Sequence, residues 1–162
     1  MSALAAMSLS QTAIAAVDDE NVDNAAGTTI SGVTYGVKLD AGGPYTIDNA
    51  GEISAAQEEL STLAYGIFVL SPVTVTSINN TSTGVIKGNL TTQNSAYGIY
   101  VNSGSIGTLI NAGLISGSVA AVDTLGAGIY LKNRSSINTL INSGTITAVS
   151  YTHLRAHETD SY

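Results

Sequence analysis

The chain has 162 residues, a length that suits one domain, and a formal net charge of −7 at pH 7. Only 10% of its residues are charged while 44% are apolar, which excludes a disordered polyelectrolyte. Five basic residues in all are too few for a nucleic-acid-binding surface, whose phosphate contacts need clustered positive charge.

The first predicted element is the end of a signal peptide, in residues 1–16. The apolar run Ala3–Leu9 is too short to span a bilayer, and Ala13-Ile14-Ala15 has the small-x-small spacing of a signal-peptidase site. Acidic residues follow at once, and no basic segment precedes the apolar run, so we expect Met1 to be an internal methionine. We predict a truncated, disordered leader remnant and export, which the absence of cysteine fits.

A first phrase then occurs four times, and its glycines are 30, 32 and 30 residues apart. The copies are Tyr35-Gly36-Val37-Lys38-Leu39, Tyr65-Gly66-Ile67-Phe68-Val69, Tyr97-Gly98-Ile99-Tyr100-Val101 and Ala127-Gly128-Ile129-Tyr130-Leu131. Period-two alternation predicts a half-buried strand, with the aliphatic pair of each copy facing inward. Lys38, Phe68, Tyr100 and Tyr130 are predicted to face outward.

A second phrase, Asn-x-Gly-x-Ile, follows each copy of the first. Its copies begin at Asn49, Asn111 and Asn142, and looser versions begin at Asn24 and Asn80. Asn and Gly tolerate left-handed backbone and mark a turn, and the β-branched residue after them begins another strand.

Polar loops are predicted where the repeats vary, at residues 56–62 and 89–95. Residues 57–64 hold Glu58 and Glu59 among helix-forming residues, so a single helical turn is predicted within this loop. Self-similarity at a fixed period, with insertions on one side of a coil, is typical of a solenoid. We predict an all-β, right-handed parallel β-helix over residues 17–148, incomplete, with about four to five coils.

The repeat pattern ends at Val149. Residues 149–159 contain both histidines of the chain, with no Gly and no Asn, and they resemble the conceptual translation of a transposase-type sequencing adapter. We predict that residues 149–162 are a non-native tail and exclude them from fold reasoning. Without His153 and His157 the chain has no histidine for a Ser-His-Asp triad, a general base or a metal site.

The remaining candidates for chemistry are scattered carboxylates, which we interpret as solvated surface charge: Asp40, Asp48, Glu52, Glu58, Glu59 and Asp123. A glycan-cleaving enzyme would need a pair of them held across one bond. The sequence therefore predicts no catalytic, cofactor-binding or metal site.

Two columns of stacked side chains are predicted instead. Asn49, Asn111 and Asn142 would form a ladder of amide hydrogen bonds, as stacked asparagines do in cross-β structure. Phe68, Tyr100 and Tyr130 would form an outer aromatic row, which could bind a glycan or a partner protein. We favour a structural role for both columns, with the row stiffening its sheet.

The stretches Leu109–Gly117 and Leu140–Ile146 resemble the passenger of a bacterial autotransporter, and the resemblance covers about residues 17–148. It implies an outer-membrane secretion route through the periplasm, and a C-terminal β-barrel that carries the β-helix to the cell surface. Filamentous adhesins share these motifs.

The expected function is a structural or adhesive stalk of a type V-secreted passenger, at the cell surface or outside the cell, with no catalysis in this fragment. Expected partners are its own C-terminal barrel, a host surface or glycan, and further copies through uncapped coil edges. The alternatives are a β-helical carbohydrate-active enzyme, which would bring Asp48, Glu52 and Asp123 together, and a filamentous adhesin secreted by a two-partner route.

Overall fold

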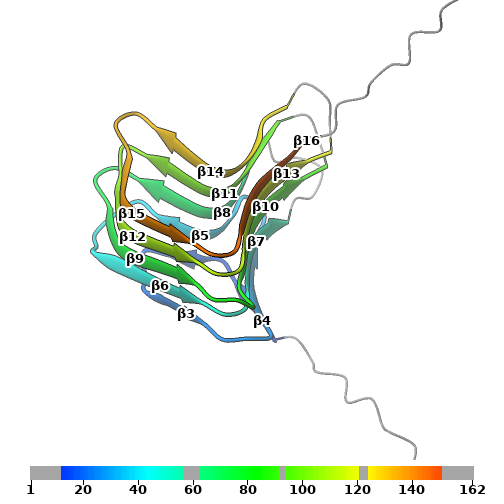
Figure 1. The fold of residues 1–162 in the computed structure, drawn as a ribbon, viewed down its shortest axis with the longest axis horizontal. Coiled ribbons are helices and arrows are strands. Elements are labelled where there is room, and N and C mark those ends of the chain that lie inside the picture. Colours follow the sequence, from blue (N-terminus) through cyan, green and yellow to red (C-terminus); the bar gives the residue numbers. More distant parts are fainter. Residues whose placement is uncertain (1–11, 57–62, 92–93, 121–123, 151–162) are drawn as a thin grey trace, which may run out of the picture.

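The computed structural model describes residues 12–56, 63–91, 94–120 and 124–150, which form sixteen β-strands and no helix. The strands lie in three sheets, and successive strands of the chain visit the sheets in turn (Figure 1). Every strand pair is parallel. The predicted all-β parallel β-helix is therefore confirmed.

Sheet A has six strands: β1 (Thr12–Ala15), β4 (Thr28–Gly32), β7 (Glu52–Ala56), β10 (Val85–Leu90), β13 (Leu114–Val119) and β16 (Thr145–Ser150). Sheet B has five strands: β2 (Val17–Asp18), β5 (Tyr35–Leu39), β8 (Leu63–Leu70), β11 (Ser95–Asn102) and β14 (Gly126–Lys132). Sheet C also has five: β3 (Val22–Asn24), β6 (Tyr45–Asn49), β9 (Thr74–Asn80), β12 (Ser105–Asn111) and β15 (Ser136–Asn142).

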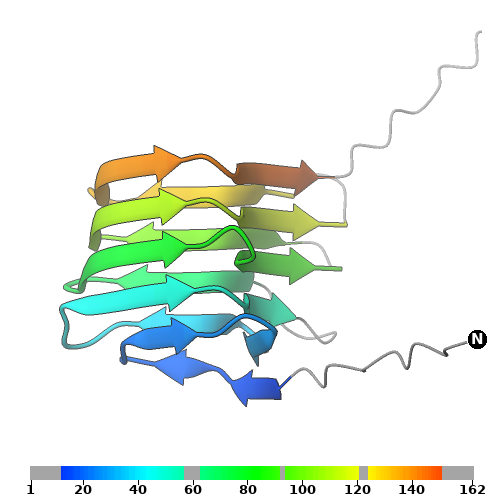
Figure 2. The ribbon, with the colours of Figure 1, turned by 60° about the horizontal axis from the view of Figure 1, so that its bottom comes forward.

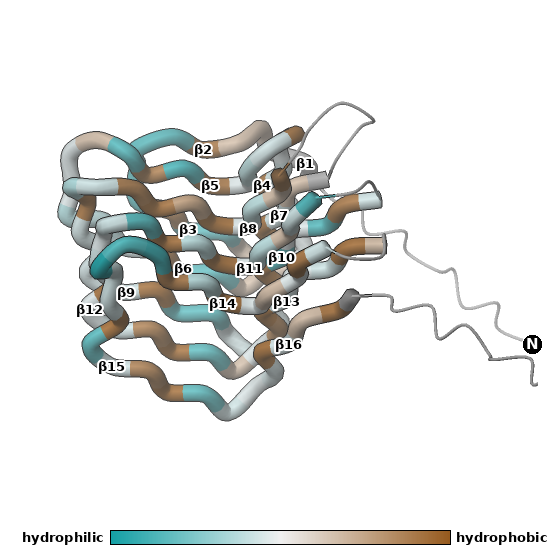
Figure 3. The backbone as a smooth tube through the Cα atoms, turned by 90° about the horizontal axis from the view of Figure 1, so that it is seen from above, coloured by the Kyte–Doolittle hydropathy of each residue, from teal (hydrophilic) through white to brown (hydrophobic). Residues whose placement is uncertain are grey.

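The first phrase of each repeat forms a strand of sheet B, and the second spans the turn from sheet C into sheet A. The copies lie in register, so that Tyr97 pairs with Tyr65 and Asn111 pairs with Asn80. Figure 2 shows the resulting stack from the side, and Figure 3 shows hydrophobic stretches recurring at matching places in neighbouring strands. Each repeated position of the sequence is thus a column of the solenoid.

The core between the three sheets consists of aliphatic columns. The predicted inward pairs of the first three phrases are fully buried, with Val37, Ile67 and Ile99 at 0% exposure. Burying an aliphatic side chain contributes about 1.5–3 kcal/mol, so these columns supply the main driving force for stacking. In the last copy Ile129 packs partly against the core, while Leu131 is exposed because no strand pairs beyond β14 among the described residues.

A glycine column brings sheets A and B into close contact. A Cβ on Gly66 would lie 2.9 Å from Ile86 Cγ2 and 2.9 Å from the backbone nitrogen of Lys87, both on β10. The same holds for Gly98, whose added Cβ would lie 2.7 Å from Ile115 Cγ2 on β13. Glycine recurs in the first phrase because the facing strand leaves no room for a side chain.

The strands extend past the predicted limits of the β-helix. Thr12–Ala15 forms β1 and pairs with β4, although residues 1–16 were expected to be a leader remnant. At the other end β16 continues through Val149 and Ser150, which pair with Ser118 and Val119. Strand pairing requires only extended backbone, so it can continue where the repeat pattern has ended. The division into leader, passenger and adapter-derived tail remains a prediction.

The variable segments are shorter than predicted. Ala56 belongs to β7, Asn89 and Leu90 belong to β10, and Ser95 begins β11. The predicted helical turn at 57–64 falls mainly outside the described residues, but Leu63 and Ala64 are in strand β8. Leu90 is fully buried with Ala64 and Ala96 in a small cluster between sheets A and B, and this burial extends the strands into the expected loop.

Candidate functional site

The outer aromatic face is a set of six rings on the outer side of sheet B: Tyr35, Tyr65, Phe68, Tyr97, Tyr100 and Tyr130. One column contains Phe68, Tyr100 and Tyr130, in register with Lys38, as the sequence predicts. A second column contains the tyrosine that opens the first three phrases. The fourth phrase has Ala127 in that place, paired with Tyr97.

The rings contact one another within and between strands. Along β8, Tyr65 and Phe68 stack with ring centroids 4.4 Å apart and an interplanar angle of 25°. Between strands, Tyr65 and Tyr97 stack at 5.7 Å and 11°, and Tyr100 and Tyr130 stack at 5.6 Å and 17°. Such pairs contribute about 0.5–1.5 kcal/mol each beyond the area they bury. The predicted stacking of the rings is present, and the stiffening of the sheet stays a prediction.

Mutual stacking leaves the centre of the outer aromatic face closed to solvent. Tyr65, Tyr97 and Tyr100 are only 5%, 6% and 8% exposed. Burial raises the pKa of the Tyr65 hydroxyl, and the neighbouring hydroxyls of Tyr100 and Tyr97 raise it further. Burial also raises the pKa of Tyr100, with a contribution from Tyr130. A ligand could therefore reach the half-buried rings, which are Tyr35, Phe68 and Tyr130, more readily than the centre.

Sequence reasoning missed the second aromatic column. Strict alternation from Ile67 would turn Tyr65 inward, but Gly66 and Ile67 both face the interior and Tyr65 faces outward. The alternation is broken at the glycine, because it has no side chain and its backbone can therefore pack closely against sheet A. The tyrosine that recurs beside this glycine in three phrases was the available signal.

The buried asparagine ladder runs along the solenoid where sheet C turns into sheet A. It contains the three predicted members and also the two looser copies: Asn24, Asn49, Asn80, Asn111 and Asn142. Each Nδ2 donates to Oδ1 of the next member, at 2.7, 2.8, 2.7 and 2.8 Å. The prediction is confirmed, and its extent is greater than the close matches suggested.

The ladder also stabilises the turns. Asn49 Nδ2 donates to the backbone oxygen of Val85 at 3.2 Å, and Asn80 Nδ2 donates to that of Leu114 at 3.2 Å. Asn49, Asn80 and Asn111 are fully buried, and no buried side-chain nitrogen or oxygen in the described part of the chain lacks a partner. Burying an amide is tolerated only when its hydrogen bonds are made, and here the stacked coils make them.

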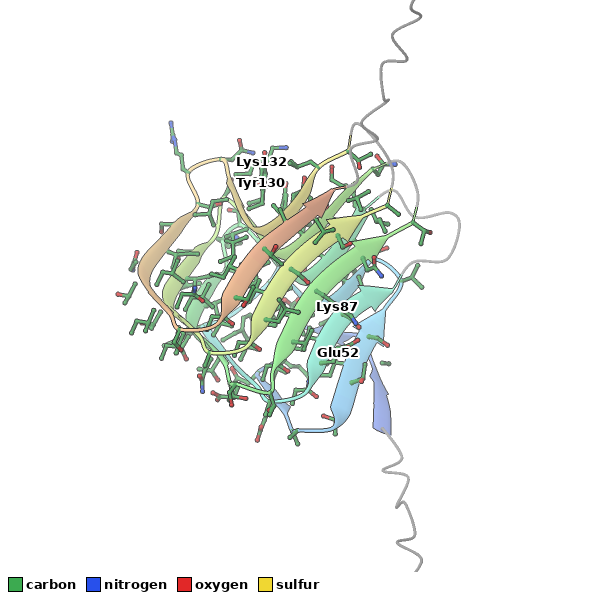
Figure 4. All side chains as sticks on the ribbon, turned by 45° about the vertical axis from the view of Figure 1, so that its right-hand side comes forward. Glu52, Lys87, Tyr130 and Lys132 are labelled. Atoms are coloured by element: carbon green, nitrogen blue, oxygen red, sulfur yellow. The ribbon has the colours of Figure 1, made fainter. Side chains whose placement is uncertain are left out.

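The carboxylates proposed for an enzyme are not gathered at one place in the described structure. Asp48 lies on β6 in sheet C and accepts a hydrogen bond from Asn79 Nδ2 at 3.1 Å. Glu52 lies on β7 in sheet A, 3.0 Å from Lys87 Nζ, and the two side chains point toward each other in Figure 4. Asp123, Glu58 and Glu59 fall outside the described residues, as do His153 and His157.

A second charged group lies near the N-terminal end of the solenoid. The backbone N–H groups of Asp40 and Ala41 donate to Asp19 Oδ1 at 2.8 and 3.0 Å. These bonds hold the pKa of Asp19 below its usual value, and the bond from Ala41 has the largest effect. Lys38 Nζ lies 2.6 Å from Asp40 Oδ2, and this contact raises the pKa of Lys38. These contacts fix the corner between sheets B and C.

No group of three or more acidic, histidine or cysteine side chains in the described ranges could hold a metal ion. The described residues likewise include no helix of the length and apolarity that a membrane span requires. Comparison with family models, with curated proteins and with solved structures finds no match to the chain. The fold is a parallel β-solenoid.

Proposed function

We propose that the chain is a structural and adhesive stalk, a passenger fragment of a type V-secreted autotransporter-type protein that is exposed on a bacterial surface. One observation carries the proposal: the repeated residues form continuous columns along the solenoid. The asparagine ladder links β3, β6, β9, β12 and β15, and the aromatic columns link neighbouring strands of sheet B. The repeated chemistry of the sequence is used to stack coils, as a rigid extended scaffold requires.

The route and location follow from the same proposal. A signal peptide would direct export to the periplasm, and a C-terminal barrel, supplied by further sequence, would bring the stalk to the outside of the cell. The half-buried rings of the outer aromatic face, Phe68 and Tyr130, are the candidate contact for a host surface or a glycan, because aromatic rings present flat apolar surface.

The sharpest test of the family is the coding DNA on both sides of the chain. The proposal expects a basic signal-peptide segment in frame upstream of Met1, and a barrel in frame beyond residue 148. A separate gene for the barrel would favour the two-partner adhesin instead. Both the autotransporter and the two-partner adhesin would be overturned if the natural gene continued through residues 149–162 to a stop codon and neither it nor a neighbouring gene encoded a barrel.

Surface display tests the role directly. The chain is fused behind an intact signal peptide and ahead of an outer-membrane translocating barrel, and protease is added to whole cells. We expect the β-helix to be cleaved from intact cells, while a periplasmic marker protein stays whole. Retention in the periplasm, with the barrel inserted, would count against a passenger role.

Binding and catalysis are separated by one further experiment. The full chain and its Tyr130→Ala variant are applied to an array of glycans, and the same glycans are analysed for cleavage. The stalk proposal expects no cleavage, and it expects any binding to weaken in the variant. Glu52→Gln serves as the matched control, because Glu52 lies on sheet A, away from the rings. Cleavage that Glu52→Gln abolishes would favour the carbohydrate-active enzyme.

A further inference from the structure

The two ends of the solenoid differ in the length of strand that they present (Figure 2). At the first end β1, β2 and β3 have 4, 2 and 3 residues, and at the last end β14, β15 and β16 have 7, 7 and 6. Each of these six strands is the outermost strand of its sheet in the described structure. Their free N–H and C=O groups can pair with another chain.

The last end also exposes side chains that are buried everywhere else in their columns. Leu140 continues the column of Val22, Ile47, Ile78 and Leu109. Leu109 is 0% exposed and Leu140 is 51% exposed, and likewise Val101 is 0% and Leu131 is 43% exposed. Apolar area of this kind is released from water when another coil covers it.

The asparagine ladder gives the two ends different hydrogen-bonding character. Every amide nitrogen donates toward the C-terminal end, so Asn142 is the last donor and uses Nδ2 for the backbone oxygen of Gly144 at 3.3 Å. At the other end Asn24 is only 1% exposed, and its Oδ1 accepts from the Thr28 hydroxyl. The last end therefore presents an open ladder donor, whereas the first end of the ladder is already closed.

The charges of the two ends are opposite and occupy the same corner of the cross-section. Residues 18–20 are all acidic and lie at the end of β2 and in the turn to β3, while Lys132 ends β14 and Arg134 lies in the turn to β15. Asp18 is in register with Lys38, whose column continues through Phe68 and Tyr100 to Tyr130. Lys132 lies two residues beyond Tyr130, on the same strand (Figure 4). A coil added at the last end would place its acidic corner against this basic one.

We propose that the last end of the solenoid binds the first end of a second copy of this chain, so that copies stack head to tail. β14, β15 and β16 would pair with β2, β3 and β1 of the next copy, the exposed Leu131 and Leu140 would be covered by that copy, and Lys132 and Arg134 would face its acidic corner. The contact joins two different surfaces and leaves one of each free, so it produces open filaments rather than a closed dimer. The inference does not depend on the proposed role at the cell surface.

A pair of copies joined by their last ends is the competing arrangement. It would cover the same leucines, but it would bring two donor ends of the ladder together and leave the acidic corner unused. The strands of the first end are short, so charge carries more of the head-to-tail contact than backbone pairing does. Head-to-tail stacking should therefore weaken as salt is raised, because salt screens exposed charges.

Sedimentation velocity of the full chain over a range of concentrations tests the proposal. We expect a ladder of oligomers at low salt and dissociation at high salt. The variant K132Q/R134Q should reduce the apparent association constant by about tenfold or more. The matched control is T76E/N89E, which changes the net charge by the same amount on exposed strands in the middle of the solenoid, and it should associate as the parent does. Circular dichroism checks that both variants keep their strands. A limiting dimer, or equal loss in both variants, would overturn the proposal.

Disulfide cross-linking distinguishes the two arrangements, because the chain has no cysteine. Asp23 and Ile141 stand in one column, through Asp48, Asn79 and Ile110, and both are exposed. In a head-to-tail stack the variant D23C/I141C would bring the two sulfurs of neighbouring copies within reach, since paired strands lie about 4.8 Å apart. Mild oxidation should then produce multimers from D23C/I141C and leave each single variant monomeric. Dimers from I141C alone would support joining by the last ends and overturn head-to-tail stacking, as would a monomeric D23C/I141C.

Discussion

The side-chain nitrogen of Asn80 lies 2.7 Å from Oδ1 of Asn111, and both residues are fully buried. Asn80 Oδ1 in turn accepts from Asn49 Nδ2 at 2.8 Å, so one side chain joins three successive coils. This position requires an amide side chain, which both donates and accepts a hydrogen bond. Ionised aspartate cannot donate one, and an aliphatic residue can neither donate nor accept.

We therefore expect Asn80→Ala to lower the free energy of unfolding by about 1–3 kcal/mol, the cost of leaving buried polar groups without partners. Urea denaturation of the full chain, at a concentration where it is monomeric, measures this loss. The matched control is Asn142→Ala, at the exposed end of the ladder, where water can replace the lost partner. Equal losses in the two variants would mean that burial of the ladder contributes nothing to stability.

The glycine column predicts a severe effect from one added methyl group. In Gly98→Ala the new Cβ would lie 2.6 Å from the backbone oxygen of Gly128 and 2.7 Å from Ile115 Cγ2, so sheets A and B must separate. Overpacking of this kind costs about 1–3 kcal/mol. Gly104→Ala is the control, because its Cβ would meet Val69 Cγ1 at 3.0 Å and the backbone oxygen of Val73 at 3.1 Å, which are both looser than the contacts at Gly98. Thermal melting should show the larger loss for Gly98→Ala.

Alkaline pH should destabilise the fold through the outer aromatic face. Burial raises the pKa of Tyr65 above that of an unfolded tyrosine, which is about 10. Between these values the unfolded chain loses the phenolic proton while the folded chain keeps it, so stability is complete below about pH 10 and falls as the pH rises. Melting temperatures from pH 8 to 11 should fall less steeply in Tyr65→Phe than in the parent chain. Identical slopes would contradict the assigned burial of the hydroxyl.

The gap in the tyrosine column offers a gain of stability. Ala127 pairs with Tyr97, and Tyr97 contacts Tyr130 with ring centroids 5.0 Å apart. Ala127→Tyr would continue the column by one ring, and an aromatic pair contributes about 0.5–1.5 kcal/mol beyond its buried area. We expect a higher melting temperature than in the parent chain or in the control Ala127→Ser. A lower melting temperature in Ala127→Tyr would show that the last coil has no room for the ring.

The repeats predicted the class of fold, because residues at a fixed period must occupy equivalent places. The inward aliphatics Val37, Ile67 and Ile99 and the outward Phe68 and Tyr100 could be read from alternation alone. The asparagine ladder could be predicted for the same reason at Asn49, Asn111 and Asn142. Asn80 was not part of that prediction, because its turn holds two extra residues, yet the turn still closes through the bond from Gly84 N to Thr81 O. Stacking of the coils restricts which residue can occupy a column, but it does not restrict the length of the turn beside it.

Other features depended on contacts that one repeat does not reveal. The outward direction of Tyr65 depends on Gly66 facing sheet A, a relation between strands that are not adjacent in sequence. The extension of strand through Leu90 depends on burial between Ala64 and Ala96, which polar neighbours such as Asn89 conceal. The charge complement of the two ends appears only when the corner at residues 18–20 and the corner at Lys132 are placed in one cross-section.

The glycine spacings of 30, 32 and 30 residues have a consequence for length. Each repeat of about 31 residues advances the molecule by one strand spacing, about 4.8 Å, whereas the same residues in a single helix would advance it by about 45 Å. Gaining or losing one repeat in frame would therefore change the length of the solenoid along its axis by only one strand spacing, and the columns of stacked side chains would stay in register.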